Sequence, residues 1–149
     1  MSTLSYVPEN SLGFMTITAN RLMSALLRRK MREAGIDLSG EQWGILVILW
    51  DRGELSQEEL TRLACMDKSA MSRLLSQLEM RELIARRPDA ANARRKIIRV
   101  TDRAESLRER CTAAARAALE QALADVEEQD RLVCLKVLET VKRTLRQAP

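Results

Sequence analysis

Three helix-start signals in the middle of the chain constrain its fold more than any other feature. Ser39 is followed three residues later by Gln42, and Ser56 is followed three residues later by Glu59. Both pairs match the capping box, in which each side chain accepts a hydrogen bond from the other residue's backbone N–H group. Asp67 is a third N-cap residue, and it lies so close to Ser56 that the helix between them must be short. The sequence therefore predicts two short helices joined by a tight turn, which is a helix-turn-helix.

Apolar residues at helical spacing predict further helices on both sides of this unit. Gly35 is the expected stop of the first helix, and the second helix is so apolar that we expect it in the core. The long first and last helices carry more apolar surface than a small lobe covers, so a second copy of the chain is the expected partner. The expected helices are residues 12–34, a second over residues 39–53, a short third from residue 56, a fourth over residues 68–81, a fifth from residue 101 and a sixth over residues 127–147.

The segment after the fourth helix changes period and concentrates positive charge. Residues 83–87 and 96–100 read as short strands, and residues 88–93 between them have the composition of a turn. Residues 81–103 hold eight Lys or Arg and three Asp or Glu, a net charge of +5, whereas the whole chain carries +4. The sequence therefore predicts an arginine-rich β-hairpin that is suited to binding a polyanion.

Composition excludes several classes of function. The chain has no histidine, which removes His-based triads, His general bases and His metal ligands. The sequence holds no glycine-rich phosphate loop, nucleophile elbow or metal-ligand cluster, so we expect neither an enzyme nor a cofactor or metal. The longest apolar run, residues 45–50, is far shorter than the roughly 20 residues that span a bilayer. We expect a cytoplasmic protein without a membrane partner.

The three cysteines lack the CxxC spacing of a zinc ribbon, and their odd number argues against a disulfide framework. Cys111 and Cys134 fall on the apolar stripes of the last two helices, where we expect them as small buried hydrophobic residues. Cys65 falls at the turn of the helix-turn-helix. It is the thiol that a redox-responsive protein of this kind would use.

The expected DNA contacts come from the fourth helix and the hairpin. The outer face of the helix carries short polar and basic side chains, which suit a major groove. At the hairpin tip, Arg94 and Arg95 suit a narrow minor groove, whereas the other hairpin cations suit phosphates. The helix face alone is equally compatible with a solvated surface, and the hairpin is what favours nucleic acid. The candidate DNA-binding residues are Lys68, Ser69, Ser72, Arg73, Gln77, Arg86, Arg94, Arg95 and Lys96.

These residues resemble the MarR family of bacterial transcriptional regulators, most closely over residues 39–101. The runs that match in order and spacing are residues 55–60, 67–75, 78–79, 83–86 and 100–101, together with Arg94, which falls on the family's wing arginine. The resemblance implies a mainly α-helical fold with a small β-hairpin, and a single domain over residues 1–149. Within it, residues 39–101 form a winged helix-turn-helix DNA-binding lobe, and residues 12–34 and 102–147 form long N- and C-terminal dimerisation helices.

The resemblance further implies a homodimer that binds a pseudo-palindromic operator in double-stranded DNA, as a repressor or less often an activator. The resemblance also implies a small aromatic or anionic effector, which binds between the dimerisation helices and the DNA-binding lobe. Arg21 and Trp43 are the candidates for that site. The alternatives are an interface position for the arginine and a core position for the tryptophan.

Two positions depart from the family pattern. Asn92 stands where the family has the Asp of an Asp-x-Arg wing tip, so we expect a neutral hydrogen bond in place of the ion pair to Arg94. Glu82 stands where the family often has Gly after the recognition helix, so we expect the left-handed C-cap to be absent. Two other functions stay open from the sequence: a winged-helix module that binds protein in place of DNA, and a thiol-based redox-responsive regulator.

Overall fold

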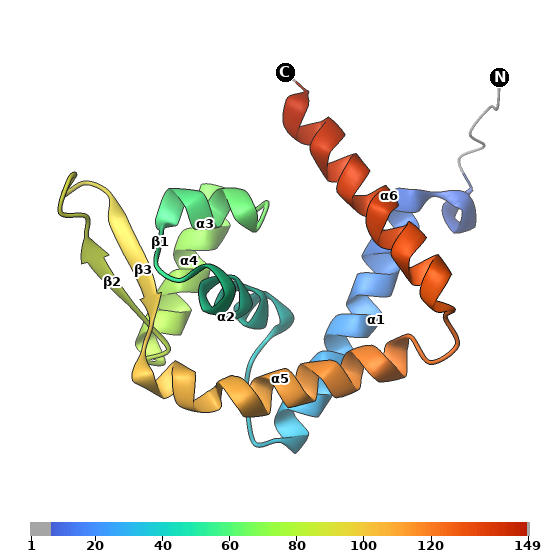
Figure 1. Cartoon of the computed structure of the whole chain (residues 1–149), viewed down its shortest axis with the longest axis horizontal. Helices are drawn as coiled ribbons and strands as arrows, with labels where there is room; N and C mark the ends of the chain where they lie inside the picture. The colour runs from blue at the N-terminus through green and yellow to red at the C-terminus, as the bar shows by residue number, and fades with distance from the viewer. Residues whose placement is uncertain (1–6, 149) are drawn as a thin grey trace.

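The computed structural model describes residues 7–148 as six α-helices, one short 3₁₀ helix and three strands. Helices α2, α3 and α4 and the sheet form a lobe at one end of the molecule, and α1, α5 and α6 extend away from it (Figure 1). The prediction of a mainly helical winged helix-turn-helix is therefore confirmed. The elements are η1 (Pro8–Asn10), α1 (Leu12–Glu33), α2 (Gly40–Arg52), β1 (Leu55–Ser56), α3 (Gln57–Leu63), α4 (Lys68–Met80), β2 (Ile84–Pro88), β3 (Lys96–Val100), α5 (Asp102–Ala122) and α6 (Glu128–Gln147).

The helix-start signals of the sequence act as predicted. Ser39 and Ser56 each form a complete capping box with the residue three positions later, at the start of α2 and α3. The carboxylate of Asp67 accepts the Ala70 N–H at 2.8 Å and caps α4. At the other end of α1, Gly35 adopts a φ of +74°, and α1 ends two residues before it. Local hydrogen bonds thus fix where each helix of the lobe begins.

The sheet has one strand more than the predicted hairpin. Strands β2 and β3 pair antiparallel as expected, and β1 adds to the free edge of β3, with Leu55 opposite Ile98 and Ser56 opposite Ile97. A strand of two residues has no periodicity to recognise, which is why the sequence did not predict β1. Strand β1 thereby joins the wing, which is the hairpin of β2 and β3, to the start of α3.

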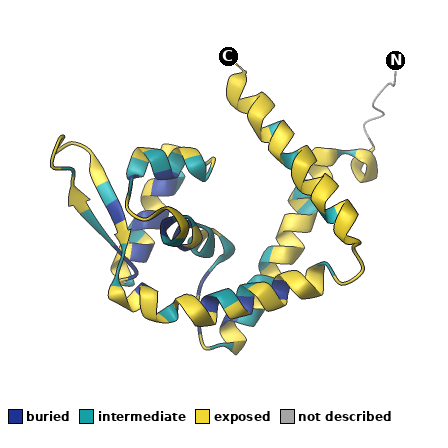
Figure 2. Cartoon of the chain, viewed as in Figure 1, coloured by how far each residue is buried: buried dark blue, intermediate teal, exposed yellow. Residues whose placement is uncertain are grey.

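The core lies within the lobe and at the junction where α1 and α5 join it. Figure 2 shows the buried residues gathered there, whereas α6 and the N-terminal part of α1 are mostly exposed. The apolar helix α2 contributes Ile45, Leu46 and Leu49 to this core, as predicted. Helix α4 turns four buried residues inward and leaves its other face free.

Helix α6 buries no residue in the protomer, although apolar side chains recur along it. The prediction that Cys134 is buried is therefore wrong at the level of one protomer, because α6 buries none of its residues against the rest of the protomer. Cys111, on the face of α5 that meets the core, is buried as predicted, and this burial raises the pKa of its thiol. Across residues 7–148, no helix has both the length and the apolar character to cross a membrane.

The end of α4 corrects a second expectation. Glu82 adopts a φ of +58°, so the left-handed C-cap is present although the residue is not glycine. The Leu83 N–H donates to the Leu78 carbonyl at 3.0 Å, and the Glu82 N–H donates to the Glu79 carbonyl at 2.9 Å, as in a Schellman motif. The turn is held from outside by Thr101, whose hydroxyl donates to the Glu82 carbonyl at 2.6 Å. These bonds impose a conformation that a side chain with a Cβ atom resists.

We therefore expect Glu82→Gly to stabilise the protein by roughly 0.5–1 kcal/mol, because glycine adopts a positive φ without the Cβ penalty. The ion pair from Arg103 to Glu82 is lost in this variant, but it is exposed and contributes little. Thermal unfolding measures the change. The control is Glu82→Ala, which loses the same ion pair and keeps the penalty; equal melting temperatures for the two variants would contradict the argument.

Candidate nucleic-acid interface and cavity

The outward face of α4 presents most of the predicted contact residues. Lys68, Ser69, Ser72 and Arg73 are exposed on its first two turns, opposite the buried leucines. None of the four makes a side-chain hydrogen bond or ion pair with another residue of the described chain (7–148). They are free to meet a ligand.

Gln77, on a later turn of the same helix, has a different environment. Its amide oxygen accepts a hydrogen bond from the Gln42 Nε2 at 3.4 Å. The other amide atom of Gln42, Oε1, accepts the Arg81 guanidinium at 3.1 Å and also closes the capping box of α2. The second half of α4 is thus held against the first turn of α2.

Arg86 anchors the wing, the hairpin of β2 and β3, to α4. From β2, its guanidinium donates to both carboxylate oxygens of Glu79 on α4, at 3.2 and 3.1 Å, and to the Ser76 hydroxyl at 3.3 Å. The side chain is only 22% exposed. The hydrogen bond from Arg86 lowers the pKa of Glu79, which keeps this carboxylate charged. Arg86 therefore positions the wing, and its guanidinium is already occupied.

Arg95 is a second anchor, between the wing and α3. Its guanidinium donates to the Ser56 hydroxyl at 3.0 Å and lies 3.4 Å from the Glu59 carboxylate and 3.8 Å from that of Asp89. The Ser56 backbone N–H, the Ser56 hydroxyl and Arg95 together lower the pKa of Glu59. A third bond, from Arg87 to Glu54 at 2.7 Å, holds β2 to the turn before β1.

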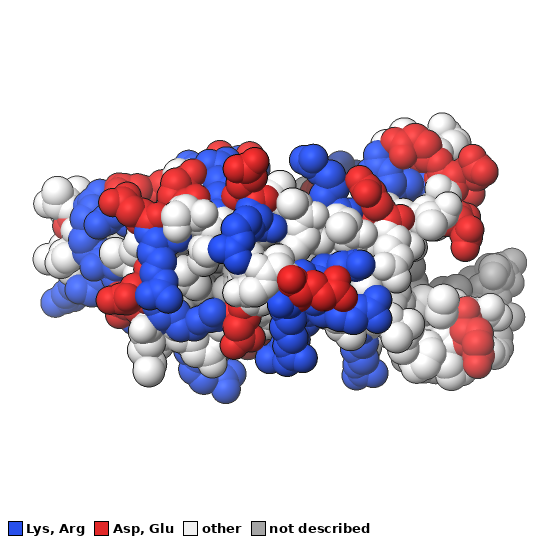
Figure 3. All heavy atoms as spheres, turned by 90° about the horizontal axis from the view of Figure 1, so that it is seen from below, with Lys and Arg blue, Asp and Glu red and all other residues white. Residues whose placement is uncertain are grey.

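Arg94 and Lys96 are the predicted wing cations whose charges stay available. Both are exposed, and neither forms an ion pair with any residue from 7 to 148. The tip itself is ordered by Asn92, whose side-chain oxygen accepts the Arg94 backbone N–H at 3.1 Å. The hydrogen bond at this position is neutral, as expected, but Asn92 accepts it from the Arg94 backbone, so it does not orient the Arg94 guanidinium as the expected bond would. Figure 3, which views the molecule from below and so from the side away from the wing tip, shows basic and acidic side chains next to one another at the wing end.

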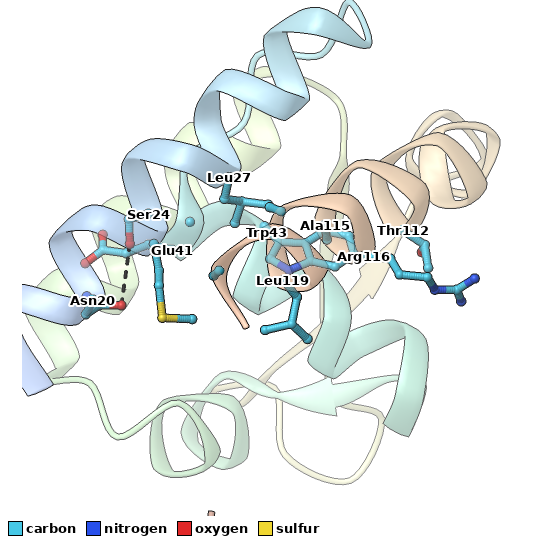
Figure 4. Close-up of a pocket in the computed structure, with 13 residues that line it drawn as sticks. Asn20, Ser24, Leu27, Glu41, Trp43, Thr112, Ala115, Arg116 and Leu119 are labelled. Carbon is cyan, nitrogen blue, oxygen red and sulfur yellow. Dashed lines mark hydrogen bonds between the residues drawn. The ribbon is translucent and has the colours of Figure 1, made fainter. Parts of the chain in front are cut away.

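A cavity of about 560 Å³ lies between α1, the first turn of α2 and the second half of α5. Figure 4 shows Leu27, Trp43 and Leu119 converging on it, so that its centre is apolar. Its rim is polar on two sides. Asn20, Ser24 and Glu41 lie on one side, with Ser24 hydrogen-bonded to Asn20, and Thr112 and Arg116 lie on the other (Figure 4).

The two effector candidates of the sequence fare differently. Trp43 lines the cavity and also packs edge-on against Trp50, with the ring centroids 5.9 Å apart. Arg21 is exposed and lies outside the cavity lining. Sequence reasoning missed Arg116, which sits one helical turn after the cavity residue Thr112 on α5. That spacing was the available signal, but an arginine on an Ala-rich helix with equal numbers of basic and acidic residues looks like ordinary surface.

Comparison with known proteins adds a family and a set of structural neighbours. Residues 38–96 match the model of the MarR family. Over 113 residues, the chain is 26% identical to an uncharacterized HTH-type transcriptional regulator, YdgJ, of Bacillus subtilis; the match covers 76% of this chain and 69% of YdgJ.

Two solved structures illustrate the likeness in fold. A probable transcriptional regulator from Pseudomonas aeruginosa is 29% identical, with a TM-score of 0.77, and the match covers 89% of this chain and 98% of that one. Bordetella bronchiseptica BpsR was solved to explain how 6-hydroxynicotinic acid regulates its DNA binding. It is 19% identical, with a TM-score of 0.80, over 97% of this chain and 99% of its own. At that identity, the second match shows the fold alone.

Proposed function

We propose that the protein is a cytoplasmic, non-enzymatic transcriptional regulator of the MarR family that binds double-stranded DNA as a homodimer, on the premise that residues 38–96 match the model of that family. The observation that carries the proposal is the division of the basic residues into two groups. The first group forms ion pairs that hold the wing to the lobe, and it consists of Arg86, Arg87 and Arg95. Arg73, Arg94 and their exposed neighbours are left for the ligand.

In this proposal, the start of α4 enters a major groove and the wing tip follows an adjacent minor groove. Lys68, Ser69, Ser72 and Arg73 read base edges and phosphates, because they are short or flexible donors on the exposed turns. Arg94 inserts at the wing tip, where a narrow minor groove concentrates negative potential. Lys96 contacts phosphate. The two lobes of a dimer would bind half-sites of a pseudo-palindromic operator about one helical turn apart, most simply as a repressor.

The homodimer is supported by the apolar side chains that one protomer leaves uncovered. Leu22 and Leu145 are 74% and 68% exposed, on α1 and α6, and both helices carry further exposed apolar residues. Many large apolar side chains exposed along two helices are typical of an interface. The further exposed apolar residues of the two helices are Leu12, Phe14, Met15, Ile17, Met23, Leu132, Val133, Leu135 and Val137.

We expect Leu22→Asp to shift the protein from dimer to monomer, because the carboxylate would be buried without a partner at the interface. The lobe should keep its fold, since Leu22 contributes almost nothing to the protomer core. Sedimentation velocity at micromolar concentration measures the change. Met80→Asp is the matched control: Met80 is 85% exposed and belongs to α4, not to the exposed apolar residues of α1 and α6, so its variant should stay dimeric. A wild-type monomer at this concentration would contradict the proposal.

The two groups of arginines should differ in how they affect DNA binding. Arg94→Gln should make the negative slope of log K against log salt concentration less steep by about one, because one contact that releases counterions is lost. Arg86→Gln should weaken binding through a displaced wing and leave the slope nearly unchanged, since its charge faces Glu79. Fluorescence anisotropy with a labelled duplex at several salt concentrations separates the two effects.

An identical slope change in both variants would show that Arg86 also faces the duplex. A wild-type protein that binds no duplex at low salt would favour the protein-interaction alternative over a regulator of transcription.

The cavity supports a role for a small effector. Its apolar centre at Trp43 fits a flat aromatic ring, and the Arg116 rim fits a carboxylate at one end of that ring. The opposite rim offers hydrogen-bonding groups at Asn20 and Ser24, which suit a hydroxyl. We therefore assign hydroxy-aromatic carboxylates as the effector class and expect them to release the protein from DNA.

Hydroxybenzoates should quench Trp43 fluorescence in a saturable manner, measured in a Trp50→Phe background because Trp50 is the other tryptophan. Arg116→Gln should weaken hydroxybenzoate binding several-fold and leave binding of the corresponding hydroxybenzamides unchanged, because only the carboxylate pairs with the guanidinium. Equal losses for acid and amide would exclude this role for Arg116.

A further inference from the structure

We propose that the C-terminal helix α6 takes part in DNA binding through Arg146, which together with Arg62 of α3 completes a groove for the sugar–phosphate backbone. The inference rests on the proposed function, since it assumes that the duplex is the ligand of this face. It assigns to a dimerisation helix a direct contact with DNA, at residues outside the recognition helix and the wing.

The groove lies between α3, the turn before α4, the wing and the end of α6, and its volume is about 900 Å³. Three separate parts of the chain therefore form its walls. Figure 1 shows the C-terminal end of α6 leaning back over the side of the molecule that carries α3. The basic residues that line the groove are Arg62, Lys68, Arg94, Arg95, Lys96 and Arg146.

The charge of this groove is unbalanced. Glu58 is the one carboxylate in its lining, against six cations. Of those cations, Arg95 alone forms an ion pair within the described part of the chain, with Glu59 and Asp89. An ordinary protein surface intersperses both signs of charge, so a concave cluster of unpaired cations is the electrostatic footprint of a polyanion.

Arg146 is unpaired for a reason that is visible in the sequence of α6. Two basic residues of this helix do form ion pairs, each with an acidic residue three positions earlier: Arg131 pairs with Glu128, and Lys142 pairs with Glu139. Three positions before Arg146 stands another arginine. The Arg146 guanidinium instead reaches the turn after α3 and donates to the Cys65 Sγ at 3.2 Å. That contact holds the charge at the groove.

Duplex DNA is the polyanion that fits the position of the groove. Lys68 begins the recognition helix and Arg94 is the wing tip, and both belong to the proposed DNA interface. A strand that passes between them runs past Arg62 and Arg146. Because each strand carries a phosphate about every 3.4 Å along the helix axis, several phosphates would face the groove at once.

The first test is the salt dependence of binding to a duplex of random sequence. Arg62→Gln and Arg146→Gln should each reduce the slope of log K against log salt concentration by about one, and each should weaken operator and random duplexes equally. Arg143→Gln, a substitution on the same helix that lies outside the groove lining, should leave the slope unchanged. An unchanged slope for Arg146→Gln, in a protein that still binds and still dimerises, would overturn the proposal while the proposed function stands.

The second test follows the thiol that lies in the groove. Cys65 is exposed and lines the groove, so N-ethylmaleimide should modify it in the free protein, and mass spectrometry can follow its rate directly. Saturating duplex should slow that modification at least tenfold. Unslowed modification in the DNA-bound protein would overturn the proposal, and equal protection by polyglutamate would overturn the assignment to DNA. A Cys65 thiol already blocked in the free dimer would show that the second copy fills the groove instead.

Discussion

The buried hydroxyl of Ser56 is the joint on which the arrangement of the DNA-binding lobe depends. The side chain is fully buried, accepts the Glu59 N–H and the Arg95 guanidinium, and donates to the Glu59 carboxylate. Its backbone belongs to β1, which pairs with β3 of the wing. One residue therefore starts α3, closes the edge of the sheet and fixes the wing. A buried hydroxyl with all of these partners is stable, whereas removal of one partner leaves buried polar atoms with fewer hydrogen bonds.

Local signals explain why so much of this fold is readable from sequence. Caps act over three or four residues, so the starts of α2, α3, α4 and α5 follow from Ser39, Ser56, Asp67 and Thr101 alone. Features that depend on tertiary context did not follow. The left-handed Glu82 is imposed by Thr101, nineteen residues away, and the pairing of β1 depends on where β3 comes to lie. The cavity could not be located for the same reason, since α1, α2 and α5 meet only in the folded chain.

The candidate interface shows the same limit in another form. Sequence reasoning divided the wing cations by their position along the hairpin and placed Arg94 and Arg95 together at the tip, because ion pairs formed in the fold are not visible along the chain. In space, Arg86 and Arg95 meet carboxylates of α4 and α3, whereas Arg94 meets none in the described part of the chain. The difference affects the affinity for DNA. A wing held by ion pairs at its base presents its tip arginine with less conformational entropy to lose on binding, so the internal pairs contribute to affinity without touching DNA.

The first turn of α2 joins the two halves of the proposed mechanism. On one side, Gly40, Glu41 and Trp43 line the cavity. On the other side, Gln42 forms hydrogen bonds with Gln77 and Arg81 at the end of α4. A molecule in the cavity would therefore contact the first turn of α2, and the same turn is hydrogen-bonded to the end of α4. If a ligand of the cavity changes the affinity for DNA by some factor, then bound DNA changes the affinity of the cavity for that ligand by the same factor. Coupling between the two sites therefore requires no long pathway, since one helical turn contacts both.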